Sequence, residues 1–197
     1  MRIGVIGAMQ MEVDNLKAVM EDVTTETYSG VEFVSGKYAN RDVVVAKCGI
    51  GKVFAAICAE AMILKFDVDK IINIGVAGSL TKDLGVLDVA VANNVVQHDM
   101  DTSPLGDPVG LLSGINMVTL DADKDMNVLL CDCLSDKGIK FKKGTIATGD
   151  QFVATKEQKD RITGMFDAIA AEMEGGSIGH VCYINNIPFA ILRSISD

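Results

Sequence analysis

Two glutamates near the end of the chain flank a single methionine and are followed directly by glycines. Glu172 and Glu174 enclose Met173, and three of the next five residues are glycine. Carboxylates beside a glycine run are poor material for a hydrophobic core, because an unpaired buried charge is costly. The two acids therefore either begin a helix or hold a polar ligand. Taken alone, Glu174 is more typical of a helix cap.

Three other side chains follow expected strands, where ligands bind in open α/β sheets. Glu12 lies at the start of the first expected helix, and Asp197 follows the last expected strand. A place near the positive end of a helix dipole also explains Glu12, and a chain end also explains Asp197. Phe152, after Thr-Gly-Asp-Gln, suits either a core position or a platform on which a flat base stacks.

The glycine-rich segments do not match the standard phosphate-binding motifs. GIGK at 49–52 is similar to part of a P-loop, but Ala46 stands where the first glycine belongs and Val53 follows the lysine. The first strand continues as GVIGAM, which lacks the GxGxxG spacing of dinucleotide-binding loops. Gly49 and Gly51 fit a tight turn between a strand and a helix.

Composition narrows the classes of partner. A formal charge of −9 argues against binding to nucleic-acid phosphates or to an anionic membrane surface. The five cysteines show no CxxC pair, no signal peptide precedes them, and only two histidines are present. We therefore expect a cytoplasmic protein with reduced thiols and no zinc site.

Apolar runs alternate with helical patterns, which predicts a three-layer α/β/α sandwich around a mixed, largely parallel central sheet. We expect one domain over residues 1–197, with a long loop at 100–118. The expected strands are 2–7, 25–30, 31–38, 41–49, 69–80, 87–99, 140–149, 167–172 and 188–194. The expected helices start near 9 or 10, 52, 121 or 123, 155 and 174, and the third and fifth of them end near 137 and 185.

Six segments in order, IGAMQMEV, GIGKV, NIGVAG, ATGDQFV, AAEMEGGSIGHVC and PFAILRSISD, span the whole chain. Together they closely resemble the bacterial 5'-methylthioadenosine/S-adenosylhomocysteine nucleosidases of the nucleoside phosphorylase superfamily. The resemblance implies a nucleoside phosphorylase-like fold and a homodimer. The family continues beyond its SD motif into a loop and a helix, and this sequence ends at Asp197 without that C-terminal helix.

The resemblance also implies the chemistry, which is hydrolysis of the bond between adenine and a 5'-thio-substituted ribose. Asp197 would donate a proton to adenine N7, and Glu12 would bind and deprotonate the attacking water. Glu174 would hold the ribose hydroxyls as a carboxylate, Met173 would pack against the sugar, and Glu172 would be structural. With this acid trio and so few metal ligands, we expect neither a metal nor a cofactor.

The remaining site residues follow from the same resemblance. Phe152 would stack on adenine, and the Val153 backbone would hydrogen-bond its edge. Gly78 would let the backbone approach the ligand, while Arg193 and Ser196 would orient Asp197 or the water. The substrate-binding set implied in this way is Met9, Gly78, Phe152, Val153, Met173, Glu174, Arg193 and Ser196.

Three positions depart from the family pattern. Val76 replaces a frequent serine, so no hydroxyl there can contact the water. Gly175 and Gly176 replace alanine or bulkier residues that are common at those positions.

Three alternatives stay open. A purine nucleoside phosphorylase would need donors for phosphate, yet the first strand–helix loop offers Glu12 and no cation before Lys17. A binding or storage protein on the same fold would be expected to have lost part of the acid trio. A related hydrolase that acts on another adenine nucleoside fits the same residues.

Overall fold

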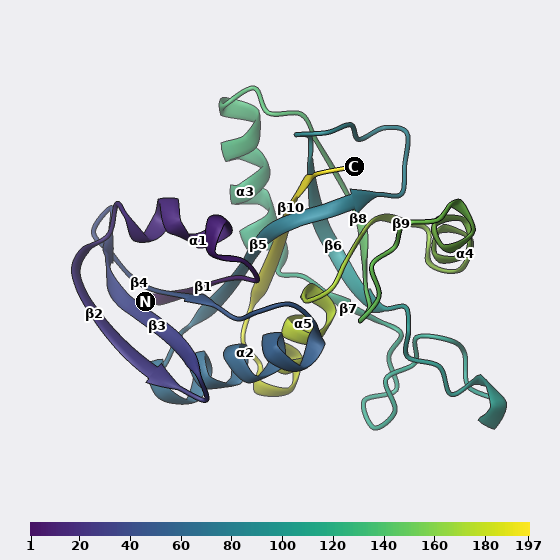
Figure 1. The fold of residues 1–197 in the computed structure, drawn as a ribbon, viewed down its shortest axis with the longest axis horizontal. Helices are drawn as coiled ribbons and strands as arrows, with labels where there is room; N and C mark the ends of the chain where they lie inside the picture. Colours follow the sequence, from purple (N-terminus) through teal and green to yellow (C-terminus); the bar gives the residue numbers. More distant parts are fainter.

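The computed structural model describes residues 1–197, in which ten strands form one mixed sheet (Figure 1). The strands are β1 (Arg2–Gly7), β2 (Glu21–Tyr28), β3 (Val31–Tyr38), β4 (Arg41–Lys47), β5 (Lys70–Ser79), β6 (Val89–Gln97), β7 (Thr119–Asp121), β8 (Phe141–Thr148), β9 (Ala168–Glu172) and β10 (Phe189–Ile195). The helices are α1 (Gln10–Lys17), α2 (Lys52–Phe66), α3 (Lys124–Asp136), α4 (Lys156–Phe166) and α5 (Gly175–Asn185).

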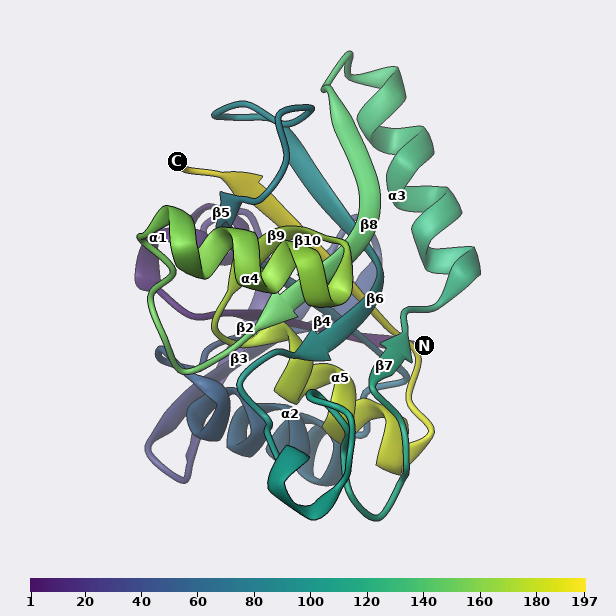
Figure 2. The ribbon, with the colours of Figure 1, turned by 90° about the vertical axis from the view of Figure 1, so that its right-hand side faces the viewer.

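Five of the strands close into a ring. β10 pairs with both β5 and β6, and β9 pairs with both β8 and β5, while β6 and β8 complete the circuit. The strands β1, β4, β3 and β2 extend from β5 as an open sheet. Figure 2 shows the strands curving around this barrel, with α3 and α4 on its outside.

The expected mixed α/β fold is confirmed, but the sheet is barrel-like where a flat central layer was expected. The cause is the length of β5, whose residues 70–73 pair with β1 and whose residues 78–79 pair with β9. β5 therefore pairs with β1 and then with β9 along the same edge, and the sheet curves to close the barrel. Five pairings are parallel (β1–β4, β1–β5, β5–β10, β6–β8, β8–β9) and five are antiparallel.

Local sequence signals explain where several helices begin. Asp123 caps α3 by accepting a hydrogen bond of 2.8 Å from the Met126 N–H. Thr155 and Gln158 form a capping box at the start of α4, in which each side chain bonds the backbone of the other. These ends agree with the sequence-based expectations.

The two glycines at the start of α5 permit close packing. A Cβ on Gly176 would lie 2.8 Å from the Thr148 Cβ, and one on Gly175 would lie 2.8 Å from the Ile191 Cδ1. Both distances are shorter than ordinary contacts, so α5 can press against β8 and β10 only because these side chains are absent. The departure from the family pattern at these positions therefore has a packing reason.

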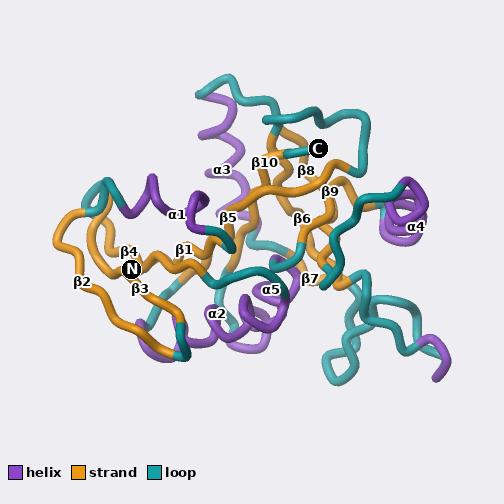
Figure 3. The backbone as a smooth tube through the Cα atoms, in the orientation of Figure 1, coloured by secondary structure: helices purple, strands orange, loops and turns teal.

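The expected loop at 100–118 projects away from the sheet (Figure 3). It contains the single-turn helix Ser103–Leu105 and an isolated bridge between Leu112 and Met117. It leads into β7, a three-residue strand that the sequence did not predict. None of the helices has the length and apolar content that crossing a bilayer requires.

Candidate active site

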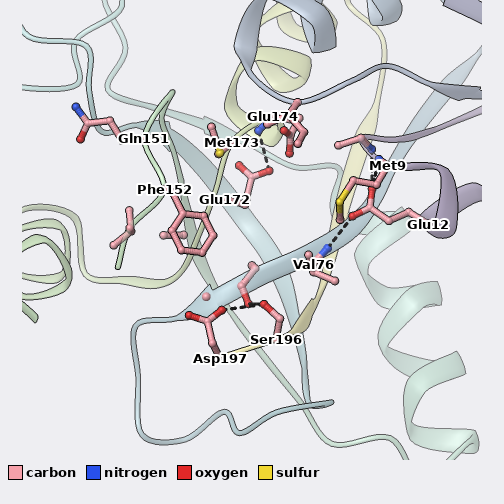
Figure 4. Close-up of a pocket in the computed structure, with 16 residues that line it drawn as sticks. Met9, Glu12, Val76, Gln151, Phe152, Glu172, Met173, Glu174, Ser196 and Asp197 are labelled. Carbon is pink, nitrogen blue, oxygen red and sulfur yellow. Dashed lines mark hydrogen bonds between the residues drawn. The ribbon is translucent and has the colours of Figure 1, made fainter. Parts of the chain in front are cut away.

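One cavity opens where β1, β5, β9 and β10 end. Nine of the ten residues expected at the site line this cavity (Figure 4). They are Met9, Glu12, Gly78, Phe152, Val153, Met173, Glu174, Ser196 and Asp197. The remaining lining residues are Ala8, Ile50, Val76, Ala77, Gln151, Ala171 and Glu172. The fold thus brings together residues that are far apart in the sequence.

Glu12 is held by backbone donors from two elements. Its Oε2 accepts hydrogen bonds from the N–H groups of Ala8 (2.6 Å) and Met9 (2.9 Å), just before α1. Its Oε1 accepts a third bond of 3.2 Å from the Val76 N–H on β5 (Figure 4). Val76 therefore contributes its backbone to the site, although it lacks the serine hydroxyl. These donors fix the carboxylate at the edge of the cavity.

Glu174 is a nearly buried carboxyl group at the start of α5. Its side chain is 6% exposed, and its Oε1 accepts a hydrogen bond of 2.9 Å from the Gly51 N–H. Burial, followed by repulsion from Glu172, raises the pKa of Glu174 to about 7. Near neutral pH this group can therefore exist with or without its proton.

Arg193 lies behind the cavity and does not line it. Its side chain is 1% exposed, forms an ion pair with Glu172, and donates a hydrogen bond of 2.6 Å to the Asn73 Oδ1. Its Nη2 is 3.6 Å from the Glu174 Oε2. In this structure Arg193 thus contacts the two acids of the Glu-Met-Glu segment, where we expected it to orient Asp197 or a water.

Glu172 has a structural position, as expected. Its carboxylate accepts hydrogen bonds from the N–H groups of Glu174 (3.0 Å) and Gly175 (2.8 Å) and from the Thr148 hydroxyl. Together with the ion pair to Arg193, these contacts join β8, β10 and the start of α5. Glu172 lines the cavity as well, but its carboxylate already accepts hydrogen bonds from four residues of the protein.

Gly75 shows how close Arg193 comes to Glu12. A Cβ on Gly75 would clash with the Arg193 Nη1 and would lie 2.9 Å from the Glu12 Oε1. The guanidinium group is thus flanked by the carboxylates of Glu12, Glu172 and Glu174. Sequence reasoning missed this arrangement, although Asn73, a polar residue inside an apolar strand, was a signal of a buried polar network.

The opposite side of the cavity is more open. The Asp197 Oδ1 accepts a hydrogen bond of 2.8 Å from the Ser196 hydroxyl, and its Oδ2 is 3.9 Å from the Lys159 Nζ. Phe152 is 75% exposed, and its ring faces the cavity (Figure 4). A Cβ on Gly78 would lie 3.5 Å from the Asp197 Oδ2, so the missing side chain leaves open space next to this acid.

Comparison with known proteins identifies the family. The sequence model of the Phosphorylase superfamily matches residues 2–197. The aminodeoxyfutalosine nucleosidase of Helicobacter pylori is 39% identical over 197 residues, which cover 100% of this chain and 85% of that protein. The 5'-methylthioadenosine/S-adenosylhomocysteine nucleosidase of Shewanella loihica is 36% identical over 199 residues, covering 100% of this chain and 86% of that protein.

A solved structure agrees with these relatives. The crystal structure of a mutant of the Helicobacter pylori enzyme with 5'-methylthioadenosine in the active site has a TM-score of 0.95 at 39% identity. The match covers 99% of this chain and 84% of that chain. The resemblance seen in the sequence motifs is thereby confirmed. The chain belongs to the phosphorylase superfamily, and within it to the nucleosidases, which hydrolyse N-glycosidic bonds.

Proposed function

We propose that this protein hydrolyses the N-glycosidic bond of 5'-methylthioadenosine and S-adenosylhomocysteine, releasing adenine and the 5'-thio-substituted ribose. The observation that carries the proposal is one cavity lined by the carboxyl groups of Glu12, Glu174 and Asp197 and by the exposed ring of Phe152. An aromatic ring suits a flat base, and carboxylates suit a sugar that becomes cationic.

In the first step, the bond between adenine and the ribose C1' breaks and its electron pair leaves with the base. Asp197 donates a proton to adenine N7, which neutralises the charge that develops on the leaving group. The ribose passes through an oxocarbenium-like state. Phe152 stacks on the base, and the Val153 backbone binds its edge. Ser196, which donates to the Asp197 Oδ1 over 2.8 Å, holds the acid in position.

In the second half of the reaction, Glu12 binds a water molecule and accepts one of its protons while the water oxygen bonds to C1'. Its three backbone donors leave it little freedom to turn away. General acid and general base catalysis each typically contribute about 10²–10⁴-fold to the rate. Glu174 accepts hydrogen bonds from the ribose hydroxyls, and Met173 packs against the sugar.

Water, not phosphate, is the proposed nucleophile. No arginine or lysine lines the cavity, and Glu12 supplies a negative charge where a phosphate would have to sit. The test is to measure adenine release from 5'-methylthioadenosine with and without inorganic phosphate. Release that required phosphate and yielded ribose 1-phosphate products would overturn the hydrolytic proposal.

A second substrate has a specific observation in its favour. Two relatives at 39% identity are named aminodeoxyfutalosine nucleosidases, and a solved structure at 39% is named a futalosine hydrolase. Other solved Helicobacter pylori structures at the same identity are named 5'-methylthioadenosine/S-adenosylhomocysteine nucleosidases. The experiment is to incubate the full-length protein with all three nucleosides and to compare kcat/KM for base release. A kcat/KM for aminodeoxyfutalosine far above the other two would move the assignment to that substrate.

A homodimer is the proposed assembly. Helices α2 and α5 lie side by side below the sheet in Figure 1, and both expose large apolar side chains. These are Val53, Phe54, Ile57, Leu64, Tyr183 and Ile184. An exposed apolar patch of this kind is typical of an interface, and a specific interface should bury more than about 1,000 Å². Light scattering at micromolar concentration tests this, and a monomeric mass would contradict it.

A further inference from the structure

The N-terminus of α2 holds two carboxylates that come from different sides of the cavity. The Gly51 N–H donates to the Glu174 Oε1 over 2.9 Å, and the next N–H, of Lys52, donates to the Asp150 Oδ1 over 2.8 Å. Gly51 occupies the N-cap position with a φ of 99° and provides no side-chain cap. The helix start is therefore capped from outside by the two acids.

An ion pair closes this arrangement into a three-residue unit, which we name the clasp: Lys52, Asp99 and Asp150. The Lys52 Nζ donates to the Asp99 Oδ1 over 2.7 Å, and the Asp150 N–H donates to the Asp99 Oδ2 over 2.9 Å. The side chains of Lys52 and Asp99 are 20% and 15% exposed, so solvent screens their attraction only in part.

The carboxylate of Asp99 is stabilised by these contacts. Burial on its own raises the pKa of Asp99, but the hydrogen bonds from Lys52 and from the Asp150 N–H outweigh burial, and the pKa is lowered. Asp99 is therefore charged at neutral pH and can hold both partners at once.

The clasp joins the two sides of the cavity. Asp150 directly precedes Gln151, Phe152 and Val153, which line the side proposed to bind the base. Gly51 directly precedes Lys52 and bonds Glu174, the proposed acceptor of the ribose hydroxyls. Phe152 and Glu174 are thus joined by a short path in which Asp150 caps the Lys52 N–H and the neighbouring Gly51 N–H bonds Glu174. Asp99 braces this path, because it bonds both the Lys52 Nζ and the Asp150 N–H.

We propose that Lys52, Asp99 and Asp150 are positioning residues for the reaction, which set the spacing between the base-binding loop and the ribose-binding carboxylate. The inference rests on the proposed function of the cavity. None of the clasp residues lines the cavity. A nucleoside must contact both sides of the cavity at once, whereas free adenine needs only the base side.

The test compares two ligands that respond differently to this spacing. In Asp99→Asn, we expect kcat/KM for 5'-methylthioadenosine to fall between about tenfold and a hundredfold, because small misplacements of binding groups strongly reduce rates. The inhibition constant of adenine should change less than about threefold, since Asp150 and Phe152 remain in one short loop. A residue that only stabilised the fold would leave the ratio of these two constants unchanged.

Two further variants keep the test independent of folding. Lys52→Arg retains a cation that can reach Asp99, so kcat/KM for 5'-methylthioadenosine and the adenine inhibition constant should stay near their wild-type ratio. Lys52→Met removes the cation and should change this ratio as Asp99→Asn does. Asp88→Asn is the matched control at the other end of β6. Like Asp99, Asp88 accepts hydrogen bonds from a lysine and from a backbone N–H. The donors are the Lys140 Nζ (2.7 Å) and the Gly85 N–H (2.8 Å), and the Asp88 side chain is 18% exposed. The Asp88→Asn variant should leave the ratio of kcat/KM for the nucleoside to the adenine inhibition constant unchanged.

The outcomes separate the inference from the proposed function. Wild-type protein that releases base from none of the three nucleosides would overturn both. Active wild-type protein would sustain the function, and the best nucleoside would then serve as the probe. If Asp99→Asn or Lys52→Met then lost nucleoside turnover and adenine affinity in equal proportion, or lost neither, the positioning role would be wrong.

Discussion

The two sides of the cavity are built differently. On the side of Glu12 and Glu174, the carboxylates are held by backbone N–H groups, and the Glu174 side chain is 6% exposed. On the side of Phe152 and Asp197, the ring is 75% exposed and the Asp197 side chain is 50% exposed. The first side is fixed by the fold before any ligand arrives, while the second is open to solvent.

This difference matches the work that each side is proposed to do. A cationic sugar is best stabilised by charges that are already oriented in a dry environment, because no reorganisation is then needed as the charge forms. A base has to enter and leave in every cycle, which favours an open side. The comparison predicts that changes on the buried side alter the rate or the fold, and that changes at Phe152 on the open side alter adenine binding.

The largest expected effect comes from Glu12→Gln. The amide keeps the shape of the side chain but cannot accept a proton from water, so kcat should fall by about 10²–10⁴-fold. Binding of adenine should stay near the wild-type value, because Glu12 is not on the base side. Steady-state adenine release and calorimetric titration with adenine would measure the two effects. A variant with normal kcat would remove Glu12 from the mechanism.

Glu172→Gln should act on the fold more than on the chemistry. The substitution removes the nearest ion-pair partner of the buried Arg193 guanidinium and leaves the more distant Glu174, and breaking a buried ion pair typically costs about 3–5 kcal/mol of unfolding free energy. Urea denaturation would measure the loss. Glu32→Gln is the control, because the Lys17–Glu32 pair, with Glu32 60% exposed, is worth at most about 1 kcal/mol. Equal stabilities for both variants would contradict the buried network.

Glu174→Gln should weaken substrate binding and also slow the reaction. A neutral amide replaces the anion beside the ribose hydroxyls, and losing such a charge-assisted hydrogen bond costs about 1.5–3 kcal/mol, or about ten- to a hundredfold. Calorimetric binding and kcat for 5'-methylthioadenosine would show both losses. If this variant behaved as wild type while folded Glu172→Gln lost most of its kcat, the roles given to these two acids would be reversed.

The effect that is smallest per unit of the variable changed concerns pH. Because the pKa of Glu174 is raised from its ordinary value of 4.5 to about 7, folded protein binds more protons than unfolded protein in this interval. The stability that Glu174 contributes is therefore complete below pH 4.5 and is lost as pH rises through about 7. The unfolding free energy of wild type minus that of Glu174→Gln should fall by at most about 1.4 kcal/mol per pH unit. A flat difference would contradict the shift.

Much of the secondary structure followed from short-range signals. The strand at 2–7 ends at a glycine, and Asp123 and Thr155 are side-chain caps whose partners lie within three residues. Closure of the barrel was not predictable in this way. It depends on β10 pairing with both β5 and β6, which lie far from it in the sequence, and on β5 being long enough to serve two neighbours on one edge.

The candidate site shows the same division. Apart from Arg193, the motif residues that the resemblance pointed to lie around one cavity, because they come from the carboxyl ends of strands or from the segments that follow them. The supporting contacts were missed, since they join distant residues such as Asn73 with Arg193 and Lys52 with Asp99. Arg193 was expected beside the ligand but contacts Glu172 and Glu174 instead. Sequence alone does not show which buried acids surround a cation.

Because β10 is paired on both of its edges, it restricts local opening of the barrel. Amide hydrogens of residues 192–194 lie between β5 and β6, so their exchange with solvent requires the barrel itself to open. Asp197 stands two residues beyond Ile195, and the Ser196 N–H is still bonded to the Ala77 carbonyl. Only Ser196 separates Asp197 from β10, so the acid is anchored directly to a strand that is paired on both edges. Heating should consequently leave the reach of this acid almost constant until the barrel itself unfolds.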